Sequence, residues 1–235
     1  MVIGIIGGMG SYATVDFFSR LMAAFPAEKE WDRPRVIIDN YCTMPSRVRA
    51  ILYNERRQEL VKNLVSSVKG LIAMGATRLV LACNTSHVFL DEIVKQVPES
   101  AGMFLNIIDV CGKDLFIKGH RNVGVIASEG TIKTKIYSET FTPYGIYVRT
   151  PDESQFNKLR YFIEAVKQNQ IEEKLLFEFI KYIDGFPDDV VILGCTELPI
   201  LYHRSLDVGF RTSKTVFDPL QSTIEFLVKE YSSRC

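Results

Sequence analysis

Short, almost purely apolar runs recur along the chain and alternate with longer amphipathic stretches. Strands that are buried on both faces of a parallel sheet have this continuous apolar character, because neither side of the strand meets water. The runs are Val2–Ile6, Val36–Asp39, Leu79–Ala82, Val123–Ile126 and Val190–Leu193. The pattern therefore predicts five parallel strands.

The stretches between these runs carry apolar residues at helical spacing. They predict helices at Ala13–Ala24, Asn54–Met74, Lys133–Phe141, Gln155–Lys167, Glu172–Tyr182 and Asp218–Tyr231. The second of these has an apolar stripe that marks a face for the core or for a dimer, formed by Leu60, Leu64, Val68, Leu71 and Ile72. Alternating strands and helices predict an open α/β fold with right-handed crossovers.

The chain also contains an internal repeat. GIIGGMG at 4–10 is matched by GVIASEG at 124–130, and LVLACNT at 79–85 is matched by VVILGCT at 190–196. In each half, an apolar strand runs into a turn and a helix, and a later strand runs into a cysteine with threonine close behind. Two matching features in the same order indicate a duplicated chain with repeat offsets of 120 and 112 residues.

Composition narrows the choice of function. Hydrophobic residues make up 47% of the 235 and charged residues 24%, as in soluble globular proteins. Because 28 basic residues balance 28 acidic ones, no overall positive field favours nucleic acid or an anionic membrane as a partner. No apolar stretch reaches the ~18 residues of a membrane span, and no basic residue precedes Arg20, so a signal peptide is not expected. We expect a cytoplasmic protein.

Five cysteines are present, an odd number without a C-x-x-C pair, which argues against a disulfide framework and a zinc site. Cys83 and Cys195 follow the ends of buried strands, where open α/β sheets bind their ligands. Each alone is most simply a small core residue, but the repeat and the polar residues that follow favour a functional role for both. We interpret Cys42, Cys111 and Cys235 as structural or incidental.

Two thiols on opposite sides of a carbon suit racemisation, in which one base removes a proton and the other returns one to the opposite face. A thiol has an ordinary pKa of ~8.5, so both protonation states are accessible near neutral pH. A helix N-terminus after each cysteine is worth only about 0.3–1 kcal/mol, which does not force both thiols to ionise. The residues predicted to bind substrate from these segments are Asn84, Thr85 and Thr196 at the α-carboxylate, Thr131 as the repeat partner of Ser11, and Glu197 at the loop or the substrate amine.

Four segments resemble the aspartate/glutamate racemase family, nearest its aspartate racemase branch. They are GIIGGMG at 4–10, ACNTSH at 82–87, GTIKTKIY at 130–137 and GCTELPIL at 194–201. The resemblance implies two pseudo-symmetric, doubly wound parallel-sheet subdomains with the active site between them. It also implies catalysis by paired cysteines without pyridoxal phosphate or another cofactor, and a homodimer. We expect residues 1–105 plus 210–235 to form the subdomain with Cys83, and residues 106–209 the subdomain with Cys195.

The same resemblance implies further substrate contacts. Met9 and Gly10 belong to the opening motif, and Arg47 in Met44–Arg47 is similar to a family arginine that binds the substrate's side-chain carboxylate. A lysine expected in a later helix falls near Val166 and Lys167, and Lys167 is the prediction. The chain departs from the family pattern at Ser11, Tyr12, Ser46 and Val48, which leaves the thiol pair intact and bears on the substrate.

The sequence therefore predicts a cofactor- and metal-independent racemase of aspartate or glutamate. One methylene discriminates only ~10- to 200-fold, so both amino acids remain candidates. A thiol enzyme acting on another carbon acid (a hydantoin racemase, a decarboxylase or an isomerase) is the alternative. A non-catalytic binder is a further one: Gly8, Gly10 and Ala13 match a dinucleotide fingerprint, with Asp39 near the place of its acidic residue. His87, one helical turn after Cys83, is predicted to be a supporting residue rather than a ligand.

Overall fold

The computed structural model describes residues 1–233, so Cys235 lies outside the described residues. The chain divides into two compact units. The first comprises Met1–Ile107 and the segment from Leu220 onward, and the second comprises Ile108–Pro219.

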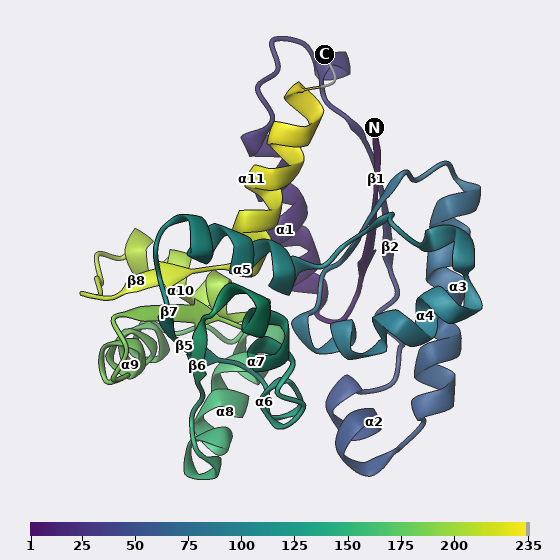
Figure 1. Ribbon diagram of the computed structural model, residues 1–235. Coiled ribbons are helices and arrows are strands. Elements are labelled where there is room, and N and C mark those ends of the chain that lie inside the picture. Colours follow the sequence, from purple (N-terminus) through teal and green to yellow (C-terminus); the bar gives the residue numbers. More distant parts are fainter. Residues whose placement is uncertain (234–235) are drawn as a thin grey trace. The chain divides into compact units, whose positions relative to one another are not determined.

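The first unit is built on a four-stranded parallel sheet in the order β2-β1-β3-β4. Its strands are β1 (Val2–Gly7), β2 (Arg35–Asn40), β3 (Arg78–Leu81) and β4 (Phe104–Leu105). Its helices are α1 (Ser11–Ala24), α2 (Arg47–Tyr53), α3 (Arg57–Ala73) and α4 (Leu90–Gln96), with short 3-10 helices η1 (Glu30–Asp32), η2 (Asn84–Phe89) and η3 (Pro98–Ser100). The C-terminal helix α11 (Pro219–Ser232) lies alongside α1, and α3 packs on β1 and β2 (Figure 1).

The second unit has a parallel sheet of the same design, in the order β6-β5-β7-β8. Its strands are β5 (Asn122–Ile126), β6 (Tyr147–Arg149), β7 (Val190–Leu193) and β8 (Thr215–Phe217). Its helices are α5 (Ile107–Ile117), α6 (Glu129–Lys133), α7 (Ile136–Phe141), α8 (Phe156–Lys167), α9 (Glu173–Asp184) and α10 (Leu198–Asp207), with 3-10 helices η4 (Thr142–Tyr144) and η5 (Glu153–Gln155). Helices α8 and α9 both pack against α10.

The two sheets repeat each other in register as well as in strand order. Gly4 lies opposite Leu79 in the first sheet, and Gly124 lies opposite Val191 in the second. These positions differ by 120 and 112 residues, the same offsets as in the sequence repeat. The predicted class of two parallel-sheet α/β halves is therefore confirmed.

The duplication extends to the helix after each last strand. Helix α5 follows β4 and begins at Ile107, while α11 follows β8 and begins at Pro219. Each of these helices joins the unit that does not contain the strand before it. In the first unit, α11 is held by an ion pair between Arg78 and Glu230 and by an edge-on contact between Phe25 and Tyr231.

Two expectations from the sequence need correction, and a third, which left two alternatives open, is decided by the structure. The return to the first unit occurs at Leu220, not at residue 210, because β8 pairs with β7 and keeps residues 210–219 in the second unit. The predicted helix Lys133–Phe141 is two helices, α6 and α7, because Lys135 adopts a left-handed conformation at φ 54°. The stripe on α3 serves the core: four of its residues are buried in the cluster that includes Ile6, and Ile72 packs against that cluster.

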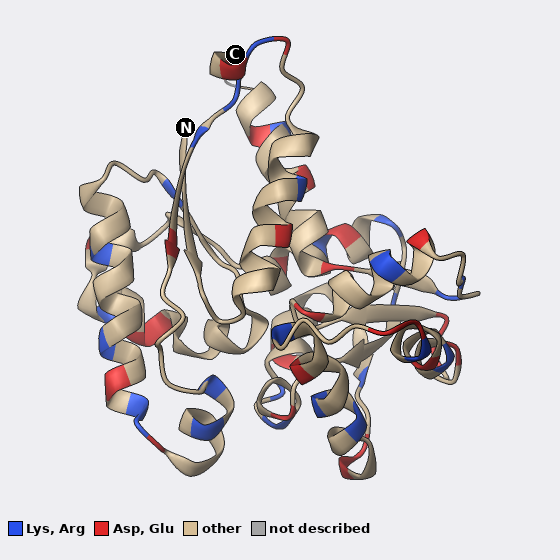
Figure 2. Ribbon diagram, turned by 180° about the vertical axis from the view of Figure 1, so that it is seen from behind, with Lys and Arg blue, Asp and Glu red and all other residues tan. Residues whose placement is uncertain are grey.

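Acidic and basic residues are interspersed along the helices of both units (Figure 2). This mixture agrees with the zero net charge of the sequence. Among the described residues, no helix is long and apolar enough to cross a membrane.

Candidate active site

Each unit has a topological switch point between its two central strands. The chain leaves β1 for β2 on one side and then returns past β1 to β3; β5, β6 and β7 repeat this path. Ligands of open α/β sheets bind at such points, beyond the carboxyl ends of the strands. The glycine segment and the cysteine of each half lie there. The backbone N–H of Ala82 donates to the Ile6 carbonyl at 3.0 Å, and that of Gly194 donates to the Ile126 carbonyl at 2.8 Å. Each cysteine is the next residue along the chain and therefore lies just beyond the end of the sheet.

The glycine loop after β1 is fixed tightly. Gly8 has a φ of 79°, and a Cβ there would lie 2.5 Å from the backbone nitrogens of Tyr41 and Cys42, so only glycine fits. The Thr14 hydroxyl accepts a hydrogen bond from the Gly8 N–H and donates one to the Gly10 carbonyl, both at 3.0 Å. The loop therefore presents Met9 and Gly10 in one conformation.

Arg47 lies against this loop. Its guanidinium donates to the Met9 carbonyl at 2.7 Å and to the Pro45 carbonyl at 3.2 Å. The Met9 sulfur in turn accepts a hydrogen bond from the Ser86 hydroxyl at 2.9 Å. The structure thus brings Arg47 and Met9 together with the segment that follows Cys83.

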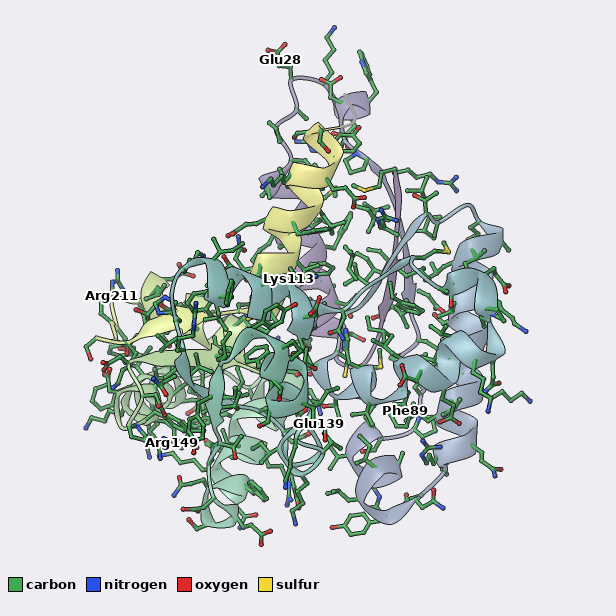
Figure 3. The ribbon with its side chains drawn as sticks, viewed as in Figure 1. Glu28, Phe89, Lys113, Glu139, Arg149 and Arg211 are labelled. Atoms are coloured by element: carbon green, nitrogen blue, oxygen red, sulfur yellow. The ribbon has the colours of Figure 1, made fainter. Side chains whose placement is uncertain are left out.

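That segment is a 3-10 helix. The Cys83 carbonyl accepts the Ser86 N–H at 3.3 Å, which closes the first turn and leaves Asn84 and Thr85 inside it, both buried. Phe89, labelled in Figure 3, ends this helix and is fully buried in the core of the unit. The Cys83 side chain itself belongs to that core cluster and is 6% exposed.

The ring of His87 bridges the backbone of Cys83 and that of Ile107. Its Nε2 accepts the backbone N–H of Ile107 at 3.3 Å, so the ring proton is on Nδ1, which donates to the Cys83 carbonyl at 2.9 Å. Burial lowers the pKa of His87 to about 4, although hydrogen bonds to backbone carbonyls work in the opposite direction. Neutral His87 is therefore a structural bridge, as predicted, between the cysteine and the start of α5.

This bridge predicts a pH dependence of stability. Because the folded-state pKa lies below the ordinary 6.5, the unfolded chain takes up the proton first, and stability falls as pH drops from about 6.5 to about 4. The contribution is on the order of 3 kcal/mol. Urea unfolding of His87→Gln should show a weaker loss of stability than wild type over this range. The half-buried His120 is the control, since His120→Gln should leave the slope as in wild type; equal slopes in all three proteins would contradict the assignment.

In the second unit, a buried carboxylate lies next to the cysteine. The Cys195 thiol donates to Glu197 Oε2 at 3.0 Å, and the Thr196 hydroxyl lies 3.5 Å from the same oxygen. All three residues are buried, and Glu197 Oε1 has no hydrogen-bond partner among the described residues. Thr196 and Glu197 precede α10, so two residues separate Cys195 from the first residue of that helix.

Lys167 is brought to this cluster from the end of α8. Its ammonium donates to Glu164 at 2.8 Å. Burial disfavours the charged ammonium, but the charge of Glu197, the hydrogen bond to Glu164 and the thiolate charge of Cys195 outweigh it, so the pKa of Lys167 is raised. Val166, the neighbouring position, is buried in the core. Substrate binding by Lys167 stays a prediction.

Thr131 lies in the short helix after β5, where the Ser128 hydroxyl is 3.0 Å from its own hydroxyl and caps the helix. Tyr137, which was not predicted as a site residue, is buried on α7, the next helix along the chain. A Cβ on Gly194 would be 3.2 Å from the Tyr137 ring. Burial, followed by the charges of Cys111, Asp218 and Cys195, raises the pKa of Tyr137 well above its ordinary value. The signal in the sequence was a tyrosine where the repeat has Phe17.

The predicted residues are thus grouped within each unit. The first unit gathers Met9, Gly10, Arg47, Cys83, Asn84 and Thr85, and the second gathers Lys167, Cys195, Thr196 and Glu197. Thr131 lies in α6 of the second unit, where its hydroxyl meets that of Ser128. Within residues 1–233, no group of three or more His, Cys, Asp or Glu side chains is arranged to hold a metal ion.

The chain is similar to known racemases in sequence and in structure. Residues 6–227 match the model of the Asp/Glu/Hydantoin racemase family. The broad specificity amino-acid racemase RacX of Bacillus subtilis is 27% identical over 203 residues, which cover 84% of this chain and 86% of that protein. The structure of Picrophilus torridus aspartate racemase superimposes with a TM-score of 0.81 at 27% identity, covering 98% and 94% of the two chains. Glutamate racemase from Campylobacter jejuni shares the fold, with a TM-score of 0.68 at 20% identity over 98% and 86%.

The matched residues include both cysteine segments, the glycine segment at 124–130 and residues 6–10 of the one at 4–10; a dinucleotide-binding site explains neither the second glycine segment nor the paired cysteines. The chain belongs to the Asp/Glu/Hydantoin racemase family and is a racemase, an isomerase.

Proposed function

We propose that the chain racemises an acidic amino acid, aspartate or glutamate, without a cofactor, and that Cys83 and Cys195 are its two bases. The observation that carries the proposal is the equivalence of the two thiols. Each follows the second central strand of its sheet, at positions that are 112 residues apart and share one strand register. A reaction that needs one base on each face of a carbon uses such a pair directly.

In this mechanism, one cysteine as thiolate takes the α-proton, and the C–H electron pair passes into the substrate's α-carboxylate. The other cysteine as thiol then gives its proton to the opposite face of the carbon. The product is the other enantiomer, and the two sulfurs have exchanged protonation states. Stabilising the charge that develops on the carboxylate is the largest electrostatic task of the site.

The residues around each thiol suit this task. Backbone amides and hydroxyls at Asn84, Thr85 and Thr196 are donors for the α-carboxylate. The planar guanidinium of Arg47 suits the side-chain carboxylate. The buried carboxylate of Glu197, whose Oε1 has no hydrogen-bond partner among the described residues, suits the substrate ammonium.

Four other residues complete the proposed substrate-binding set: Lys167, Thr131, Met9 and Gly10. In this proposal, the protein binds a small amino-acid substrate and no other ligand, and neither nucleic acid nor a membrane is a partner. It acts as a homodimer in the cytoplasm.

The experiment that tests this function follows hydrogen exchange at the α-carbon in deuterated water, with no added cofactor. The substrates are both enantiomers of aspartate and of glutamate, with alanine and a 5-substituted hydantoin as comparisons. We expect exchange with at least one acidic amino acid, in both enantiomers, well above that with alanine. Exchange of the hydantoin alone would assign the chain to another branch of the family, and exchange of none would contradict a role as an amino-acid racemase.

A further inference from the structure

The two cysteine segments differ at one equivalent position. Two residues after Cys83 the chain has Thr85, whereas two residues after Cys195 it has Glu197. Both side chains are buried, at 5% and 2% exposure. The repeat therefore has a neutral hydroxyl residue in one half at the position where the other half has a carboxylate.

The carboxylate is in direct contact with its thiol. The 3.0 Å distance between Cys195 Sγ and Glu197 Oε2 is a hydrogen bond in which the thiol is the donor. A thiol can donate in this way, but a thiolate cannot, and a thiolate and a carboxylate at this distance repel each other. The contact itself therefore favours the protonated form of Cys195.

Other charged groups around Cys195 come from four elements. Helix α8 supplies Lys167 and, bonded to it, Glu164. Helix α7 supplies Tyr137, which stays protonated because its pKa is raised well above the ordinary value. Helix α5 supplies Cys111, and the turn before α11 supplies Asp218; both interact electrostatically with that phenol. Lys167 interacts with both Glu197 and Cys195, so it stabilises Glu197 as a carboxylate when Cys195 is a thiol, and it stabilises the thiolate after the proton has left.

The contacts of Cys83 are different in kind. Its carbonyl is held by neutral His87 and by the Ser86 N–H, and the side chains that follow it are an amide and hydroxyls. Arg47 is linked to this segment through Met9, whose carbonyl accepts from the guanidinium and whose sulfur accepts from the Ser86 hydroxyl. These contacts contain no carboxylate that accepts the Cys83 proton.

We propose that Glu197 is a positioning residue that keeps Cys195 as the protonated thiol in the substrate-free enzyme, so that Cys83 is the base for the first proton. This rests on the proposed function of the thiol pair. One turnover moves the substrate proton to Cys83 and the Cys195 proton to the product. The enzyme returns to its starting form when Cys83 releases a proton to water and Cys195 takes one from water, or when it turns over the opposite enantiomer.

The test uses alkylation of the free enzyme by iodoacetamide, with each cysteine followed by peptide mass spectrometry. For each cysteine, the alkylation rate at about pH 7 is divided by the rate at about pH 10, which lies above the ordinary pKa of a thiol. Differences in access of the reagent cancel in this ratio, because they affect both rates equally. In wild type we expect a lower ratio for Cys195 than for Cys83. In Glu197→Gln the ratio of Cys195 should rise about tenfold, since a neighbouring negative charge is removed, while that of Cys83 stays the same.

Two further variants separate this role from a merely structural one. Glu197→Asp keeps the charge and should give a ratio between those of wild type and Glu197→Gln. Glu164→Gln removes a carboxylate that binds Lys167 but makes no hydrogen bond to the Cys195 sulfur. This variant should change the Cys195 ratio less than about twofold. An unaltered rate at about pH 10 shows that the loop is intact in each variant.

The inference is overturned if Cys195 has the same ratio in wild type and Glu197→Gln, or if Cys83 has the lower ratio in wild type. Alkylation needs no substrate and no turnover. A failure here combined with racemisation that requires both cysteines would remove the role of Glu197 alone. Racemisation that survives loss of either cysteine would instead remove the proposed function.

Discussion

Replacing either Cys83 or Cys195 by serine should lower the rate of racemisation by about 10²- to 10⁴-fold, the usual contribution of a general acid or base. A serine hydroxyl keeps the size of the side chain but is far too weak an acid to exist as the anion near neutral pH. Both directions of the reaction should suffer in each variant, since each direction needs one base and one acid. Racemisation is measured by following optical rotation or chiral chromatography from each enantiomer.

Cys42→Ser is the matched control, because this thiol is exposed and lies in the same unit as Cys83. It should keep the wild-type rate. Activity that survives in either Cys83→Ser or Cys195→Ser within about tenfold of wild type would mean that the corresponding thiol is not a catalytic base.

The second large effect concerns recognition of the substrate side chain. Arg47→Met keeps the length of the side chain but removes the guanidinium, and it should lower kcat/KM for the acidic substrate about 10- to 150-fold. This range corresponds to the loss of a hydrogen-bonded charge worth about 1.5–3 kcal/mol. Steady-state kinetics with the acidic amino acid and with alanine should show the loss for the acidic substrate only.

Arg49→Met is the control for this change. Arg49 lies on the same helix, two residues further along, but it is exposed and pairs with Glu55. It should leave the kinetics unaffected. Equal losses for the acidic substrate and alanine in Arg47→Met would show instead that Arg47 acts by holding the Met9 carbonyl in place.

The four central strands, β1, β3, β5 and β7, were predictable because each is a largely apolar run buried on both faces. The edge strand β2 was also predicted from its apolar run, although none of its residues is fully buried. The other edge strands were not predicted: β4 has two residues, and β6 and β8 have three each, so no period is visible. A helix N-terminus after Cys195 was predicted, and α10 begins there at Leu198, but the extent of this helix to Asp207 was not predicted. The boundary at Leu220 depends on the pairing of β8 with β7, a contact between segments that no local pattern reveals.

Some features of the candidate site could likewise be predicted from the sequence, and others could not. The two cysteines were predictable because the repeat makes their positions equivalent, and Arg47 and Lys167 because of family resemblance. The bridge from His87 to Ile107 was not, since it joins residues 20 positions apart through a ring tautomer that only the fold determines. The contact between Cys195 and Glu197 depends on the conformation of a loop, and the position of Lys167 near it depends on the packing of α8.

The most direct test of the two-base mechanism measures where deuterium appears during the first few per cent of conversion in deuterated water. With two bases, the acid that protonates the product carries a solvent deuteron, so the product enantiomer should be deuterated almost completely while the remaining substrate stays protonated, in both directions. Return of the substrate's own proton to the product, or early deuterium in the substrate at the same rate as in the product, would indicate a single base and would contradict the account.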